Sequence, residues 1–203
     1  MDNFNKNVFV NCPFDDNYRQ LLISVIFTIK TLGFIPRFSL ERSDSGETRI
    51  HKILELIRES KFGIHDLSRI VATGPDEHFR MNMPFELGID YGCQKLMGDI
   101  WGTKKILILE KEKYRYQRAL SDLSGSDIKS HNDDPLIIIK TVRNWFVPSE
   151  INRAPSGNVI WNNFNDFQAY LFEELVNIDG HESVDDVEIV EVIRLMDEWL
   201  NMN

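Results

Sequence analysis

Two hydrophobic periods alternate along the first 110 residues. Short runs typical of β-strands occur at 8–10, 34–40, 62–66 and 104–110, and the last is nearly continuous in apolar residues, as in a buried parallel strand. Between these runs, apolar residues recur every three or four positions over 17–32, 50–57 and 82–96, which predicts three amphipathic helices. The alternation predicts an α/β fold, with a parallel sheet of four or five strands and helices on both faces.

Local signals indicate where these elements begin and end. Gly33 is placed to cap the first helix, and Pro36 favours an edge position for the second strand. Asp44 is interpreted as the N-cap of the second helix, with a ligand-binding role as the alternative, and Pro84 suits the first position of the third helix. One face of the third helix is predicted to be its apolar face: Phe85, Ile89, Cys93 and Leu96.

After residue 110 the alternation ends. Residues 114–134 are polar and predicted to be irregular or partly helical, whereas 135–146 fit either a helix or a strand because three isoleucines follow one another there. Two further helices are predicted at about 163–176 and 184–202. We therefore expect an α/β domain over residues 1–149 and an acidic helical segment over 150–203 that packs on it.

Charge is unevenly distributed along the 203 residues. The net charge is −9, yet residues 1–149 carry 21 basic and 20 acidic side chains, whereas 150–203 carry 2 and 12. A nearly neutral first part can accept an anionic nucleotide without a repulsive field, but it lacks the basic surface of a general nucleic-acid binder. No direct binding to nucleic acid is expected.

Cysteine content and hydropathy argue against a disulfide-stabilised, zinc-binding, secreted or membrane protein. Two cysteines cannot form a disulfide framework, no Cys/His cluster has zinc spacing, and no dinucleotide or P-loop glycine motif is present. The first residues lack the pattern of a signal peptide, and the longest apolar segment, 21–34, is too short to span a bilayer. We expect a soluble cytoplasmic protein with no membrane contact and no metal.

Polar loops are predicted to converge at one edge of the sheet. In open parallel sheets, ligands bind beyond the carboxyl ends of the strands. Four segments of this chain meet there in the predicted topology: 11–16, 42–47, 66–69 and 81–87. A site assembled from four segments is a stronger candidate than any single motif.

Glu86 and Asp66 are the two candidate carboxylates of this edge. Glu86 is expected in the first turn of its helix, where it can stabilise or attack an oxocarbenium-like centre, or simply stabilise the helix. Asp66 closes a strand and can bind ribose hydroxyls or form an Asx turn. Arg49 can reach a phosphate or lie on a solvated face, and His65 is interpreted as a packed residue rather than a general base.

Three features resemble the nucleoside 2-deoxyribosyltransferase superfamily and the related TIR-type NAD-cleaving domains: VFVNCPF followed by an amphipathic helix, an Asp that closes the third strand, and FELG-x-x-x-G at the start of the third helix. The resemblance covers about the first 110 residues. It implies a flavodoxin-like sheet in which Glu86 is the catalytic carboxylate and Asp66 the acidic residue that ends the third strand. The stretch from Phe9 to Gly92 is also similar to an uncharacterised bacterial family associated with anti-phage defence.

The resemblance implies cleavage of an N-glycosidic bond, or ribosyl transfer, on NAD, a nucleotide or a nucleoside, which is a substrate and not a cofactor. Asp44, Asn11 and Arg49 would contact sugar or phosphate, while Phe14 and Phe85 would stack on the base. The full set of predicted substrate contacts is Asn11, Cys12, Pro13, Phe14, Asp44, Ser45, Arg49, Asn82 and Phe85. Homo-oligomers are expected.

Two observations keep an alternative open. The deoxyribosyltransferase pattern has a small residue ahead of its glutamate, whereas bulky Met83, Pro84 and Phe85 stand there in this chain. TIR-like folds also serve as protein-interaction domains. The alternative is therefore a non-catalytic module for nucleotide sensing or assembly in a bacterial signalling or defence pathway.

Overall fold

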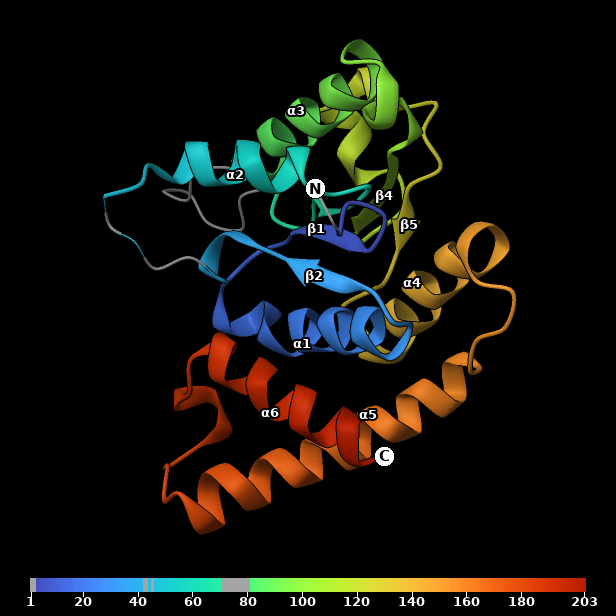
Figure 1. Cartoon of the computed structure of the whole chain (residues 1–203). Helices are drawn as coiled ribbons and strands as arrows, with labels where there is room; N and C mark the ends of the chain where they lie inside the picture. Colours follow the sequence, from blue (N-terminus) through green and yellow to red (C-terminus); the bar gives the residue numbers. More distant parts are fainter. Residues whose placement is uncertain (1–2, 42–43, 45, 71–80) are drawn as a thin grey trace. The chain divides into compact units, whose positions relative to one another are not determined.

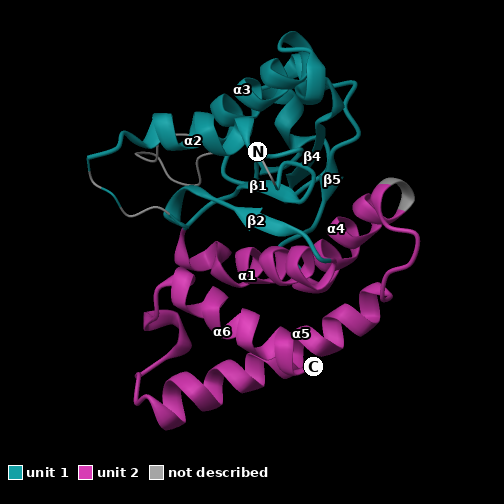
Figure 2. Cartoon of the chain, in the orientation of Figure 1, with its two compact units in different colours: residues 1–14, 33–134 teal, residues 15–32, 135–203 magenta. Residues whose placement is uncertain are grey.

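The computed structural model describes residues 3–41, 44, 46–70 and 81–203. Figure 1 shows the succession of strands and helices along the chain. The chain forms two compact units, each made of separate stretches of sequence (Figure 2). One comprises Met1–Phe14 and Gly33–Asp134, and the other Asp15–Leu32 and Pro135–Asn203. The predicted boundary between residues 149 and 150 stays a prediction.

The first unit is built on a five-stranded sheet. Its strands are β1 (Asn7–Asn11), β2 (Ile35–Arg37), β3 (Phe62–Asp66), β4 (Lys105–Glu110) and β5 (Lys129–Ser130). They run in the order β2-β1-β3-β4-β5, and every neighbouring pair is parallel. This all-parallel sheet, with helices along the chain and at its C-terminal end, confirms the predicted α/β, flavodoxin-like fold class.

Two helices of the first unit pack on one face of this sheet. Residues of α2 (Arg49–Arg58) and α3 (Asn82–Leu96) surround Phe9 of β1 in a common apolar core. The strand register places Phe9 beside Gly63, and Gly63 beside Ile106, so these three residues share that face. Asn11 and His65 follow two positions later on the same strands, at the carboxyl ends.

Short helical turns complete the first unit. They are η1 (Ser39–Glu41), η2 (Asp99–Thr103), η3 (Arg115–Arg118) and η4 (Ser121–Leu123). The last two lie in the region 114–134, which is partly helical, as predicted, and which also contains the two-residue strand β5. Pro36 lies in β2 at the edge of the sheet, where the missing N–H costs no internal hydrogen bond, also as predicted.

The second unit is helical. It contains α1 (Asp16–Thr31), α4 (Pro135–Glu150), α5 (Gly157–Phe172) with a π-helical continuation η5 (Glu173–Ile178), the short turn η6 (Val184–Asp186) and α6 (Ile189–Met202). The aromatic ring of Phe27 on α1 lies 5.5 Å from those of Phe164 and Phe167 on α5, and 5.7 Å from that of Trp199 on α6. These rings form the core that joins α1 to helices far along the chain.

Acidic residues of the C-terminal segment pair with α1. Arg19 lies 3.3 Å from Asp185, and Lys30 lies 2.5 Å from Asp197. The buried residues of α6 follow a helical stripe: Ile189, Val192, Met196 and Trp199. The predicted amphipathic helix is thus present, although it begins at Ile189 and not near 184.

Several local predictions need correction or are resolved. Residues 135–150 are helical, which settles the ambiguity of the isoleucine run. Gly33 has a φ of +79° just after α1, the left-handed conformation expected of a helix C-cap. Asp44 is not the N-cap of α2, because the cap is Thr48 and the Asp44 carboxylate instead accepts the N–H of Gly46.

The predicted apolar face of α3 is confirmed for Ile89 and Cys93, which pack in the core, and is wrong for Phe85 and Leu96. Phe85 and Leu96 are 60% and 85% exposed, whereas the buried residues of this helix are Met83, Glu86, Leu87, Asp90 and Cys93. Two carboxylates therefore lie on the inner face. Pro84 is the third residue of α3 and not the first, still within the turn whose N–H groups lack helical partners.

Candidate functional site

The candidate site lies where α2 and α3 begin, next to the carboxyl ends of β1 and β3. Glu86 is the fifth residue of α3, just beyond its first turn, and only 4% of it is exposed. Its Oε1 lies 3.6 Å from Nη2 of Arg49, the first residue of α2. The Arg49 side chain is 52% exposed, so the guanidinium faces both the carboxylate and solvent.

Burial controls the ionisation of Glu86. Removal from water raises the pKa of its carboxyl group from 4.5 to about 6, while the charge and hydrogen-bonding capacity of Arg49 oppose the rise. A carboxylate with this pKa is mostly ionised at neutral pH and can still take up a proton during a reaction.

A buried polar cluster lies behind Glu86 on the same helix face. Asn11 Nδ2 donates to the Met83 carbonyl at 3.0 Å and lies 3.0 Å from His65 Nδ1. His65 Nε2 is 2.9 Å from Asp90 Oδ2, and Lys104 Nζ is 3.0 Å from Asp90 Oδ1. Exposure of the Asn11, His65, Asp90 and Lys104 residues is at most 2%.

The charges of this cluster are balanced. Burial opposes the ionisation of Asp90, but the hydrogen bond from His65 and the charge of Lys104 outweigh it and hold the pKa of Asp90 below its usual range. The Lys104 ammonium also donates to the carbonyls of Ile57, at 2.8 Å, and Ser60. Lys104 therefore makes two hydrogen bonds to main-chain carbonyls and an ion pair with Asp90.

Asp66 belongs to a second buried group. Its Oδ1 accepts the N–H of Ser68 at 2.8 Å, and its Oδ2 lies 2.9 Å from Nε2 of His131. His131 Nδ1 accepts the N–H of Asp133, so Nε2 carries the ring hydrogen and faces both Asp66 and the Ser68 hydroxyl, 3.0 Å away. A histidine in this state cannot activate Ser68 as a nucleophile.

This arrangement ties the loop after β3 to the end of β5. Asp66 is fully buried and both of its carboxylate oxygens have protein partners, which favours a structural role over contact with ribose. Its predicted substrate role stays a prediction.

The remaining predicted contacts differ in exposure. Cys12 and Pro13 are buried and Phe14 is half-buried, whereas Asp44, Asn82 and Phe85 are exposed. Ser45 lies outside the described residues. Of the predicted set, Arg49 contacts Glu86, and Asn11 at the end of β1 contacts the main chain at the start of α3.

Sequence reasoning missed the partners that hold this site. Gly63, Asp90, Lys104 and His131 were not singled out, although Asp90 follows Glu86 by four residues and so must share its helix face. Two acids four residues apart on one helix face were the signal in the sequence that could have indicated a buried polar cluster.

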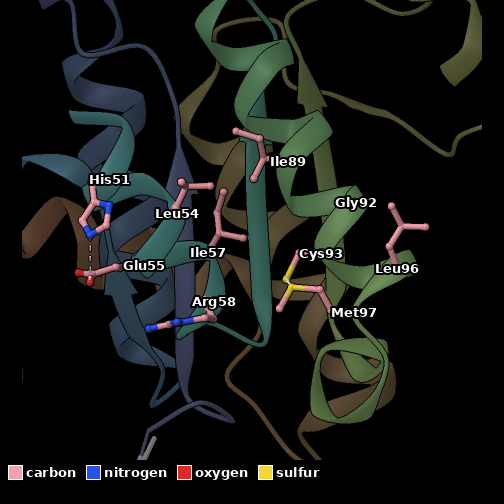
Figure 3. Close-up of a pocket in the computed structure, with 10 residues that line it drawn as sticks. All are labelled: His51, Leu54, Glu55, Ile57, Arg58, Ile89, Gly92, Cys93, Leu96 and Met97. Atoms are coloured by element: carbon pink, nitrogen blue, oxygen red, sulfur yellow. Dashed lines mark hydrogen bonds and ion pairs between the residues drawn. The ribbon is translucent and has the colours of Figure 1, made fainter. Parts of the chain in front are cut away.

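A separate hollow lies between α2 and α3 (Figure 3). Its volume is about 520 Å³, and its α3 wall consists of Gly92 and apolar or sulfur-containing side chains. Its lining residues are His51, Leu54, Glu55, Ile57, Arg58, Ile89, Gly92, Cys93, Leu96 and Met97. A Cβ on Gly92, or on Gly88 one turn earlier, would meet no atom within 4 Å, so neither glycine is needed for close packing.

Within residues 3–41, 44, 46–70 and 81–203, no group of three or more His, Cys, Asp or Glu side chains is arranged to hold a metal ion. Across the same described part of the chain, every helix is too short or too polar to cross a membrane. Comparisons with family models, with curated proteins and with solved structures return no match for this chain.

Replacing Arg49 with Met is expected to raise the pKa of Glu86 above 6, because the change removes the cation that opposes the effect of burial. The carboxyl ¹³C shift of Glu86, followed by NMR during a pH titration, measures this directly. Arg58→Met, at the other end of the same helix, is the matched control. An Arg49→Met titration that overlays that of the parent would contradict the assignment of this ion pair.

The raised pKa also sets a pH dependence of stability. Folded Glu86 has a pKa of about 6 against 4.5 for an unperturbed glutamate, so the folded chain binds this proton more tightly. The resulting stabilisation is present below pH 4.5 and is lost as the pH rises through 6. Between these values Glu86→Gln is expected to show a flatter dependence of unfolding free energy on pH than the parent.

Proposed function

We propose that this chain cleaves the N-glycosidic bond of NAD or a related nucleotide or nucleoside, with Glu86 as the catalytic carboxylate. The observation that carries the proposal is the placement of Glu86: a buried carboxylate beside a half-exposed Arg49, at the edge of a parallel sheet where ligands bind. The motif resemblance to deoxyribosyltransferase-like and TIR-like proteins supports the same role.

The chemistry follows from the charge on Glu86. As the C1′–N bond breaks, its electron pair leaves with the base and positive charge develops at C1′ and the ring oxygen. The ionised carboxylate stabilises that charge or forms a transient C1′–O bond, and water or a second acceptor then takes the ribosyl group. Water attack releases one proton to solvent.

The surroundings of Glu86 favour a leaving group that needs no protonation. Among the described residues, Glu86 pairs with Arg49 and Asp90 pairs with His65 and Lys104, so no second carboxyl or imidazole group contacts Glu86. A pyridinium base departs as a neutral molecule, whereas a neutral purine base requires an acid. NAD is therefore the substrate that we favour within this class.

Exposed groups next to Glu86 fit the rest of a nucleotide. Arg49 presents half of its side chain to solvent and can contact a phosphate, and Phe85, 60% exposed on the neighbouring position of α3, can stack on a ring.

Replacement of Glu86 by Gln is expected to lower base release by at least about 100-fold, because the amide keeps the shape of the side chain but carries no charge. The measurement is mass spectrometry of products after incubation of the full chain with NAD and a nucleotide mixture. Glu112→Gln, an exposed acid outside the site, is the matched control. Equal turnover by parent and Glu86→Gln would reject the assignment.

A second candidate is a non-catalytic module that senses nucleotides or assembles into homo-oligomers. The observation that favours it is the exposure of Phe85, Tyr91 and Leu96 on α3, which are large apolar side chains left in contact with solvent. A ligand that raises Tm and is recovered intact after long incubation, together with a molar mass above that of one chain, would support this candidate.

A further inference from the structure

The sheet holds α3 at two points on either side of Glu86. The first point is the carbonyl of Met83, which accepts a hydrogen bond from Asn11 on β1. The second is the carboxylate of Asp90, which contacts His65 on β3. Because Asn11 also contacts His65, the two anchors form one continuous chain of hydrogen bonds from the helix, through two strands and back to the helix.

The direction of these hydrogen bonds is determined. Asn11 Nδ2 can only donate, so His65 Nδ1 must accept and the ring hydrogen must lie on Nε2. Nε2 then donates to Asp90 Oδ2. Each donor and acceptor in the chain fits a neutral His65, and a reversal at any step would leave a buried polar group unpaired.

Glu86 lies between the anchors on the same face of α3. It follows Met83 by three residues and precedes Asp90 by four, spacings that put the three side chains on one stripe of the helix. The anchors are about two helical turns apart, so together they fix the rotation of the helix and its distance from the sheet.

We propose that Asn11 and His65 are positioning residues that hold Glu86 buried in its reactive orientation. The catalytic part of this inference rests on the proposed function of Glu86. It replaces the predicted role of Asn11 as a substrate contact, because Asn11 is 2% exposed and its amide N–H groups are used within the protein.

The same strand offers a matched control for a purely structural effect. Asn7 lies at the opposite end of β1, is 4% exposed, and donates its amide to the carbonyl of Glu59 at 2.9 Å. Asn7, Phe9 and Asn11 are two positions apart on β1, so their side chains lie on the same face of the sheet. Asn7→Ala removes a buried amide of equal size and leaves the hydrogen-bond chain to α3 intact.

The experiment measures the pKa of Glu86 by ¹³C NMR in folded protein, with Arg49, the cation that faces it, left unchanged. In Asn11→Ala we expect the pKa of Glu86 to fall from about 6 by at least about half a unit toward 4.5, because a loosened α3 admits water. Asn7→Ala is expected to lower Tm by a similar amount without moving this pKa. A loss of stability alone cannot produce that difference.

Turnover supplies the second measurement. Asn11→Ala is expected to lower kcat at least about tenfold with KM within about twofold of the parent, since orientation is lost and binding contacts are not. Asn11→Ser, which keeps a small polar group beside His65, is expected to lower kcat and the pKa of Glu86 to a smaller extent. It is also the variant to measure if Asn11→Ala does not fold.

Each outcome separates this inference from the proposed function. A parent that turns over NAD, with Asn11 variants that keep both the Glu86 pKa and kcat, would overturn the positioning role and leave the function intact. A parent with no turnover would remove the function, yet the titrations would still decide whether Asn11 controls Glu86. A KM increase at unchanged kcat would return Asn11 to substrate binding and overturn the inference.

Discussion

Lys104→Met is expected to lower the free energy of unfolding of the first unit by about 3–5 kcal/mol, the range for removal of one partner from a buried ion pair. The ammonium of Lys104 contacts Asp90 and two main-chain carbonyls, and only 2% of the residue is exposed. Methionine fills most of the same volume but leaves the carboxylate of Asp90 and the carbonyls of Ile57 and Ser60 without this donor.

Urea unfolding monitored by circular dichroism measures this loss. Lys113→Met makes the same chemical change at an exposed position and is expected to stay within about 0.5 kcal/mol of the parent. A double variant, Lys104→Met with Asp90→Asn, removes the orphaned charge and is expected to be more stable than the sum of the single losses predicts. Strict additivity would show that the two groups do not act as a pair.

Gly63→Ala is expected to be nearly as damaging, although it adds one methyl group. A Cβ on Gly63 would lie 2.1 Å from Oδ2 of Asp90 and 2.9 Å from Nε2 of His65, inside the hydrogen bond between them. The fold must either move β3 away from α3 or break that hydrogen bond in a site closed to water. We expect a loss of about 3 kcal/mol or more.

A second glycine provides the comparison for this substitution. Gly88 lies exposed on α3, and a Cβ there would meet no atom within 4 Å. Gly88→Ala is expected to be neutral or to stabilise by up to about 1 kcal/mol, because alanine favours the helix. Thermal unfolding of the two variants side by side tests the contrast, and a Gly63→Ala protein as stable as the parent would mean that His65 and Asp90 are not in contact.

Much of the fold was predictable because local hydrophobic periodicity indicates where the strands and helices lie. The four longer strands and the first helices lie where apolar runs alternate with helical stripes, and β1, α1 and β3 bury the apolar residues of their patterns. The strand β5 has two residues, too few to show any periodicity, and depends on pairing with β4.

The orientation of α3 was not predictable from hydrophobicity. A stripe of Phe85, Ile89, Cys93 and Leu96 fits the helical period, yet the protein buries Glu86 and Asp90 in place of Phe85 and Leu96. The reason is that His65 donates a hydrogen bond to Asp90 and Lys104 supplies the opposite charge. Partners from distant parts of the chain can make a polar face the inner one, and no local window contains them.

The same limit applies to the predicted ligands. Asp66 was correctly placed at the end of a strand, but its partner His131 lies 65 positions later, in a region without periodicity. Asn11 was placed at the correct edge, and its use within the protein became visible only with the contacts to Met83 and His65. Position at the edge was thus predictable, while the division between ligand contact and internal support was not.

The interleaving of the two units has a consequence for synthesis. Helix α1 is translated early, but its aromatic partners on α5 and α6 lie beyond residues 33–134, which belong to the other unit. At about 5–20 residues per second, the ribosome needs roughly 5–20 s to make the intervening stretch of about 100 residues. During that delay the apolar stripe of α1 has no native partner within its own unit, so a nascent chain is expected to need a chaperone at this stage more than at any later one.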